Sequence, residues 1–399
     1  MASIDLETQL SEEEQAIRET VHKFAEDVMR PAGIALDALA DPADVIAKDS
    51  ILWEVFAKHR ALGLDEIQNP DSGLSPIQQA RLRSIISEEL GWGDSGLAIS
   101  FGVTGFPRNL AMMSGKPALL ERFAHPEMIG CWAITEPDHG SDQIRFATDP
   151  NVEHLGKPNC IARKEGESFV ISGQKAAWVS NGTIADAAAL FCAVDMGQGV
   201  EGVGALLVPL DDPAVSRGKP LDKIGQRALN QGEIFFDGVR VSADHLLIPP
   251  QAYAAFGDVG LSQANAGMGG LFVGLAQAGL DLALAYAKER VQGGVPIFQH
   301  QSVKSRLFEM FRKVEAARAL NRRVVTYNAV HPPQIEYAIA SKVTSTQTAF
   351  EVTSAALQIY GGNGLSREYP IEKLMRDARA SMIEDGCNEV LGLAAADRL

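Results

Sequence analysis

The chain changes its sequence pattern twice, and this change constrains its fold more than any other feature. Before about residue 130, apolar side chains recur at helical spacing. In the segment 11–31, Ser11 and Glu14 form a capping box and Pro31 ends the predicted helix. Short β-type runs separated by Gly, Asp, Asn and Pro occupy about 131–242. Long helical patterns return from about residue 252.

This order predicts an α+β protein of three domains. We expect an N-terminal α-helical domain over 1–130 and a middle antiparallel β domain, a barrel or sandwich, over 131–245. Several long antiparallel helices usually form a bundle, so we expect a C-terminal four-helix bundle over 246–399.

Composition excludes several classes of function. A net charge of −15 over 399 residues argues against binding to nucleic acid or to an anionic membrane surface. The four cysteines show neither CxxC nor Cys/His ligand spacing, so we predict reduced thiols and no metal site. The start of the chain has neither an Arg-rich presequence nor an apolar signal core, and no apolar run approaches the ~20 residues of a membrane span. We therefore expect a cytoplasmic protein.

One glycine motif matches a dinucleotide-binding pattern but does not predict such a site. Residues 197–202, GQGVEG, match GxGxxG, but a strand-like run follows them. A dinucleotide-binding fingerprint requires a helix there, whose N-terminus meets the pyrophosphate. We predict a hairpin instead.

Four segments carry groups suited to a binding or catalytic site. The segment 131–142, CWAITEPDHGSD, offers hydroxyl and backbone N–H groups to a polar ring edge or an anion. The segment 173–182 contains Trp178, and 288–301 contains Arg290, a guanidinium suited to phosphate. The segment 358–390 contains a glycine-rich break and then two adjacent carboxylates before a glycine. Read singly, the first three segments are explained better by a polar turn, a core tryptophan and a helix-terminal arginine than by a site.

Together and in this order, these segments resemble the acyl-CoA dehydrogenase family. ITEPDHGSD is similar to the first signature of that family, and QIYGGNGLSREYPIEKLMRDARASMIEDG is similar to the second nearly residue for residue. IGQRALNQGEIFFDGVRV resembles the strand segment between them. The resemblance covers roughly residues 10–395.

The resemblance implies an FAD enzyme that removes two hydrogens from the α and β carbons of an acyl-CoA thioester and passes electrons to an electron-transferring flavoprotein. It also implies a homo-oligomer, a dimer or tetramer, in which neighbouring subunits share each FAD. The residues that it places around the cofactor are Trp132, Ile134, Thr135, Gly140, Ser141, Trp178, Ser180, Cys387 and Glu389, with Arg290, Gln301, Gln358, Gly361 and Gly362 on the ADP half of the neighbour's FAD. Those that it places near the substrate are Ser141, Asn265 and Gly386.

The catalytic base is the point where the sequence departs from the family. Alignment on Gly386 puts Asp385 where the best-known members carry a Glu base. Other members place the base on the first long C-terminal helix, and that position is Ala264 here. Asp385 is therefore the leading candidate, Glu384 is a rival through a shifted turn, and the absence of a functional base stays open.

Other departures leave the function open too. Cys387 stands where a Thr usually bonds to flavin, Asn265 replaces an Arg, and Gly293 replaces a Phe. Two alternatives therefore remain. One is a partner subunit without chemistry in a hetero-oligomer, and the other is a flavin monooxygenase or oxidase of the same fold.

Overall fold

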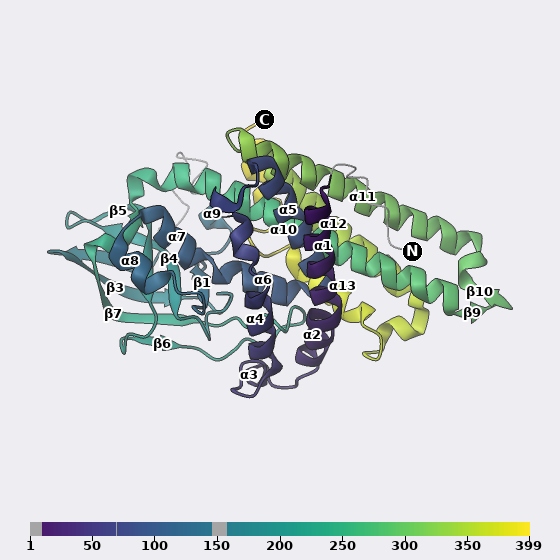
Figure 1. Cartoon of the computed structure of the whole chain (residues 1–399). Helices are drawn as coiled ribbons and strands as arrows, with labels where there is room; N and C mark the ends of the chain where they lie inside the picture. The colour runs from purple at the N-terminus through teal and green to yellow at the C-terminus, as the bar shows by residue number, and fades with distance from the viewer. Residues whose placement is uncertain (1–9, 69, 146–157) are drawn as a thin grey trace.

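The computed structural model describes residues 10–68, 70–145 and 158–399, and it has the predicted order of helices, sheet and helices (Figure 1). The sheet lies at one end of the molecule and the long helices extend to the other. The N-terminal helices cross the middle, over the bundle. Residues 1–9, which carry part of the argument about targeting segments, lie outside the described residues.

The described residues 10–68 and 70–145 contain nine α-helices: α1 Glu12–Phe24, α2 Arg30–Asp37, α3 Pro42–Val45, α4 Ile51–Ala61, α5 Pro76–Gly93, α6 Ser95–Thr104, α7 Phe106–Ser114, α8 Pro117–Phe123 and α9 Asp142–Arg145. The capping box of Ser11 and Glu14 is confirmed. The predicted stop at Pro31 is wrong, because the helix continues as α2 to Asp37. A π-helical turn over Ala25–Met29 precedes this proline and re-phases the backbone, so Pro31 falls in the first turn of α2, where its missing N–H costs little.

The middle region is an eight-stranded sheet with the strand order β6-β7-β3-β2-β4-β5-β8, and β1 pairs with β4. The strands are β1 Gly130–Ala133, β2 Ile161–Glu165, β3 Ser168–Lys175, β4 Ala187–Asp195, β5 Val200–Pro209, β6 Val215–Arg217, β7 Ile234–Ser242 and β8 Leu246–Ile248. Most neighbours are antiparallel, as predicted, but β1 and β2 both pair with β4 in parallel. The GQGVEG segment lies in the antiparallel β4–β5 hairpin, which confirms that it is not a dinucleotide-binding loop.

The C-terminal region is a bundle of α10, α11, α12 and α13, with α14 packed against α12. The bounds are α10 Pro250–Glu289, α11 Gln301–Val330, α12 Ile335–Tyr360, α13 Ile371–Ser381 and α14 Asn388–Ala396, and β9 Val291–Gln292 pairs with β10 Val295–Pro296 before α11. Helix α10 is long and apolar enough to cross a membrane by length and composition. However, 78% of its most apolar window is buried inside the structure, as expected of the central helix of a bundle.

Two glycines allow the N-terminal helices to dock directly on α10. A Cβ added to Gly274 would lie 1.9 Å from the carbonyl oxygen of Glu88 in α5, and one added to Gly91 would lie 2.0 Å from that of Leu271. The backbones of α5 and α10 therefore touch. This contact belongs to a single hydrophobic core that spans the N-terminal helices and the bundle, while the sheet has cores of its own.

Candidate active site

The two adjacent carboxylates lie in the turn between α13 and α14. Asp385 has a φ of 51° and Gly386 a φ of 92°, so both residues occupy the left-handed region, which aspartate tolerates better than most side chains. Lys342 of α12 is fully buried and donates from Nζ to Gly386 O and Asn388 Oδ1, each at 2.9 Å. The turn is therefore held from beneath by a buried cation.

Asp385 is accessible to solvent, yet the protein around it desolvates its carboxylate. Its side chain is exposed to solvent, yet the surrounding protein is dense enough that desolvation raises the pKa of Asp385, while the charge of Lys342 opposes this rise. A raised pKa makes a carboxylate a better proton acceptor near neutral pH.

The loop after β1 meets the Asp385 turn. The Ser141 hydroxyl accepts a hydrogen bond from the Cys387 N–H at 2.9 Å, which joins the first and the last sequence motifs. A buried ion pair fixes the start of this loop, because Lys175 Nζ donates to Glu136 Oε1 at 2.6 Å and to Ile134 O at 3.1 Å. Both of the paired side chains are 0% exposed.

The segment after β3 borders the same loop. The Ala176 N–H donates to Thr135 O at 2.9 Å, and two residues later the Trp178 side chain is 57% exposed. Sequence reasoning missed Gln231, whose Nε2 donates to Trp178 O and to Ser180 Oγ. An exposed indole held by its backbone is unusual for a core tryptophan and suits a residue that covers a planar ligand.

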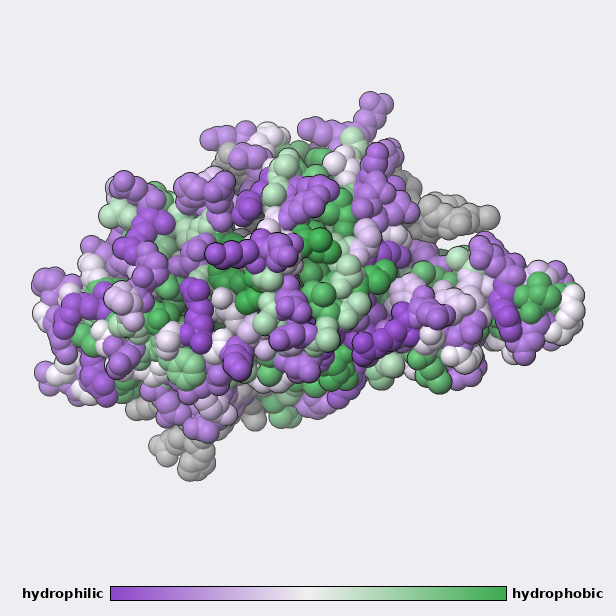
Figure 2. Space-filling model, turned by 90° about the horizontal axis from the view of Figure 1, so that it is seen from below, coloured by the Kyte–Doolittle hydropathy of each residue, from purple (hydrophilic) through white to green (hydrophobic). Residues whose placement is uncertain are grey.

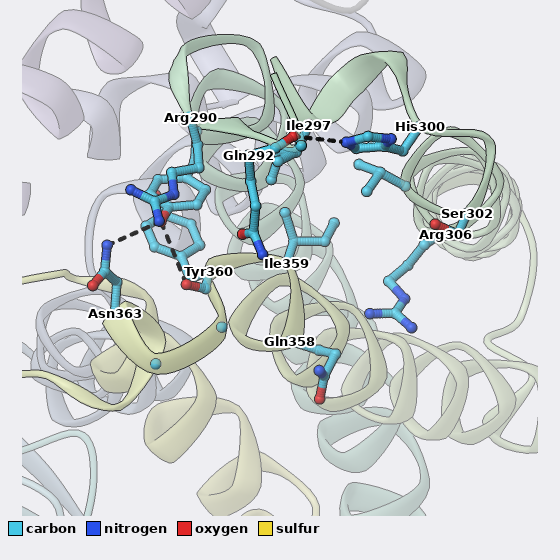
Figure 3. A pocket seen from close by; sticks show the side chains of 15 residues that line it. Arg290, Gln292, Ile297, His300, Ser302, Arg306, Gln358, Ile359, Tyr360 and Asn363 are labelled. Carbon is cyan, nitrogen blue, oxygen red and sulfur yellow. Dashed lines mark hydrogen bonds between the residues drawn. The ribbon is translucent and has the colours of Figure 1, made fainter. Parts of the chain in front are cut away.

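The predicted ADP-side residues lie elsewhere, beside the β9–β10 hairpin at the end of the bundle away from the sheet (Figure 1). Arg290, Gln358, Gly361 and Gly362 line a cavity of about 860 Å³ there. Figure 3 shows Arg290 near Asn363 on one side of this cavity and Arg306, a residue that sequence reasoning missed, on the other. Gln301 is exposed at the start of α11 but does not line the cavity.

The remaining predicted residues lie apart from these two groups or at their edges. Trp132 is half-buried and stacks on Phe191, with ring centroids 4.6 Å apart. Gly140 is exposed beside Ser141, and Glu389 is exposed in the first turn of α14. Asn265 is fully buried in α10, and its Oδ1 has no hydrogen-bond partner in the structure.

Comparison with known proteins identifies the family of this chain. Residues 131–239 match the acyl-CoA dehydrogenase middle domain, and residues 259–399 match the acyl-CoA dehydrogenase C-terminal domain. A probable acyl-CoA dehydrogenase of Bacillus subtilis is 30% identical over 403 residues, covering 98% of this chain and 99% of the relative. The chain belongs to the acyl-CoA dehydrogenase family.

Other acyl-CoA dehydrogenases agree over nearly the whole chain. The mitochondrial short-chain specific acyl-CoA dehydrogenase of Bos taurus is 30% identical, covering 98% of this chain and 91% of the relative. The butyryl-CoA dehydrogenase structure from Megasphaera elsdenii superposes with a TM-score of 0.83 at 26% identity and covers 98% of both chains. Acyl-CoA dehydrogenases are FAD-dependent oxidoreductases, so the predicted family, class of enzyme and cofactor are confirmed.

Proposed function

We propose that the protein catalyses FAD-dependent α,β-dehydrogenation of an acyl-CoA thioester and that Asp385 removes the α-proton. The observation that carries this proposal is the state of Asp385, an accessible carboxylate with a raised pKa on a turn fixed by Lys342. Accessibility lets the carboxylate reach a bound substrate, and the raised pKa makes it a competent base near neutral pH.

Asp385 is one methylene shorter than the usual Glu base, so its carboxylate is set back by roughly 1.5 Å, enough to matter when a misplacement of about 1 Å can cost 100-fold. Two contacts fix the turn that carries Asp385. Lys342 holds Gly386 O, and Ser141 accepts from the Cys387 N–H. We infer that this fixed turn presents the shorter side chain to a substrate that lies correspondingly closer.

The residues near this turn fit a flavin ring. Trp178 offers an exposed indole, the carbonyl oxygen of Thr135 accepts from the Ala176 N–H, and the Ser180 hydroxyl accepts from Gln231 Nε2. The hydride from the β-carbon would go to FAD held by these residues, and Asp385 would take the α-proton.

The cavity at the other end of the bundle fits the ADP half. Arg290 and Arg306 supply positive charge for the phosphates. Gly361 and Gly362 have no atom within 4 Å of an added Cβ, so the backbone is open to a ligand there.

The two proposed halves of the FAD site lie at different ends of the bundle. Leu261 in α10 packs against the hydrophobic cluster that contains Leu391 of α14, close to the Asp385 turn, whereas Arg290 directly follows the last residue of α10. Arg290 comes 29 positions after Leu261, and 29 positions span about 43 Å along a helix, which exceeds the length of an extended FAD. We therefore infer that each FAD is shared by two copies of the chain, in a dimer or a tetramer.

Two further parts of the proposal concern reactants. We propose that the reduced cofactor passes its electrons to an electron-transferring flavoprotein, as the family resemblance implies. Because relatives of this chain are named for short-chain and butyryl substrates, short straight acyl-CoAs are the first substrates to test.

Anaerobic flavin bleaching tests the function. The FAD-loaded protein should lose its yellow colour when mixed with its acyl-CoA substrate, in a panel of straight, branched and cyclic thioesters. Absence of bleaching with the whole panel would contradict the proposal and favour a partner subunit without chemistry. Bleaching that fails while oxygen is consumed with externally reduced flavin would favour a monooxygenase or oxidase.

A further inference from the structure

Glu384 is a half-buried carboxylate beside the proposed base that the mechanism above does not use. Its Oε1 accepts a hydrogen bond of 2.6 Å from Nε2 of Gln226, which lies in the connection between β6 and β7. The contact joins the middle region to the α13–α14 turn. It gives Glu384 a fixed position directly before Asp385 in the chain.

Gln226 is itself held firmly. It is 2% exposed and has a φ of 50°, a left-handed conformation that a glutamine rarely adopts. Its backbone N–H donates to Oδ1 of Asp377 in α13, and Asp377 pairs with Lys373 at 2.6 Å. Lys373 also pairs with Asp94 at 2.5 Å, so three parts of the chain converge to set the amide that meets Glu384.

Charged groups of several elements face Glu384. Asp385 is adjacent, Lys342 approaches from α12, and Lys223 approaches from the β6–β7 connection. The amino group of Lys223 donates to two neutral oxygens, Leu229 O at 2.8 Å and Gln231 Oε1 at 2.7 Å. Other titratable groups surround these two lysines. Asp377, Arg227 and Asp94 lie around Lys223. Cys387 and Glu389 lie around Lys342.

These surroundings put the ionisation of Glu384 in the range where an enzyme works. Burial, with the charge of Asp385, raises the pKa of Glu384 to about 7, while Gln226, Lys342 and Lys223 oppose the rise. Below this value Glu384 is protonated and carries no charge. Above it a second negative charge stands beside the base.

We propose that Glu384 is a positioning residue for Asp385: bound to Gln226, it fixes the turn that carries the base, and its ionisation strengthens that base. This inference rests on the proposed function. The second charge raises the affinity of Asp385 for a proton, so proton abstraction from the substrate is faster once Glu384 is ionised.

The test compares the wild type with Glu384→Gln and Gln226→Met, all loaded with FAD. The glutamine keeps an oxygen that can accept from Gln226 but cannot ionise, and the methionine removes the donor at similar volume. Glu13→Gln, a change of an exposed carboxylate in α1, is the matched control. Two quantities are measured against pH: the rate of anaerobic flavin reduction, and the infrared carbonyl band of protonated carboxyl groups.

The wild type and Glu13→Gln should show an upper rise in rate near pH 7, together with a carbonyl band that disappears over the same range. Glu384→Gln should lose both features. Gln226→Met should move both to higher pH, because the amide hydrogen bond holds the pKa of Glu384 down. A purely structural role would lower thermal stability without moving the upper rise in rate.

The inference is overturned if Glu384→Gln keeps the upper rise and the band, or if Gln226→Met leaves both at the wild-type pH. These outcomes differ from a failure of the proposed function. That failure would appear as no flavin reduction with any thioester of the panel, or as undiminished flavin reduction in Asp385→Asn, and the infrared band of Glu384 does not depend on turnover.

Discussion

At the scale of single residues, the proposed chemistry depends on a carboxylate whose ionisation is displaced toward neutral pH. Because burial raises the pKa of Asp385, protons compete with substrate for this group at higher pH than for an ordinary aspartate, whose pKa is about 3.9. The rate of flavin reduction should therefore fall on acidification through a value above 3.9, as Asp385 takes up a proton.

Asp385→Asn should lower the rate of flavin reduction by about 10²–10⁴-fold, the usual contribution of a general base. The amide has nearly the same shape and also tolerates a left-handed backbone, so FAD content and melting temperature should stay close to those of the wild type. Stopped-flow absorbance at the flavin band checks the rate. A variant that reduces flavin at the wild-type rate would exclude Asp385 as the base.

The sequence indicated candidate site residues that lie in contiguous motifs. It missed residues that contact the candidate site from other helices and strands. Asp385, Ser141 and Trp178 lie in contiguous motifs, and the structure brings Ser141 to the Asp385 turn. Lys342 and Gln231 belong to other elements and reach the site through contacts that no periodicity reveals. A lysine within an apolar stripe of α12 was the available signal for Lys342, since a buried cation requires partners.

At the scale of elements, the buried ion pair of Lys175 and Glu136 supports the loop after β1. Lys175→Met should destabilise the protein by about 3–5 kcal/mol, because it leaves the Glu136 carboxylate buried without its partner. The paired change Lys175→Met with Glu136→Leu should recover part of this loss, since it removes both charges. Urea denaturation followed by circular dichroism measures both. Equal stability of the wild type and the single variant would contradict the assigned pair.

The crossing of α5 and α10 gives a second prediction at this scale. Gly274→Ala should destabilise the protein by roughly 1–3 kcal/mol, because the new Cβ meets the backbone of Glu88 and forces the helices apart. Gly267→Ala in the same helix is the control: nothing lies within 4 Å of its added Cβ, so it should gain about 0.5–1 kcal/mol of helix propensity. Differential scanning calorimetry should show opposite shifts in melting temperature.

The sequence predicted the order of elements better than their ends and pairings. Helical and β-type periodicities are strong over long segments, so the three-part order is confirmed. The continuation past Pro31 depends on a π-helical turn, which has no clear sequence signal. The parallel pairing of β1 and β2 with β4 depends on where connections run, and strand patterns alone do not specify this.

At the scale of the whole molecule, exposed apolar side chains offer a test of the proposed association of several copies. Figure 2 shows hydrophobic groups gathered near the middle of one face, among hydrophilic ones. On α11, Phe308 is 61% exposed and Phe311 is 44% exposed, one turn apart. Phe308→Glu with Phe311→Glu should shift the protein toward monomer in analytical ultracentrifugation and lower its FAD content, if this helix face is buried between copies.

Mixing two inactive variants tests whether FAD is shared. Asp385→Asn removes the base, and Arg290→Ala weakens the phosphate site at the other end of the bundle. In a mixed dimer with shared cofactors, one site carries both defects and the other carries neither. Equal co-expression should therefore restore about a quarter of wild-type activity. Recovery no greater than the sum of the two variants alone would show that each chain binds its own FAD.

The single unbroken helix α10 has a further consequence for such an assembly. Its 40 residues connect the region of the base to the phosphate cavity without a hinge. The spacing between the Asp385 turn and the Arg290 cavity of one chain is therefore set by the number of peptide units in one rigid element. Deleting one heptad near its middle would shorten that spacing by about 10 Å and displace the cavity relative to the turn in every copy of the chain.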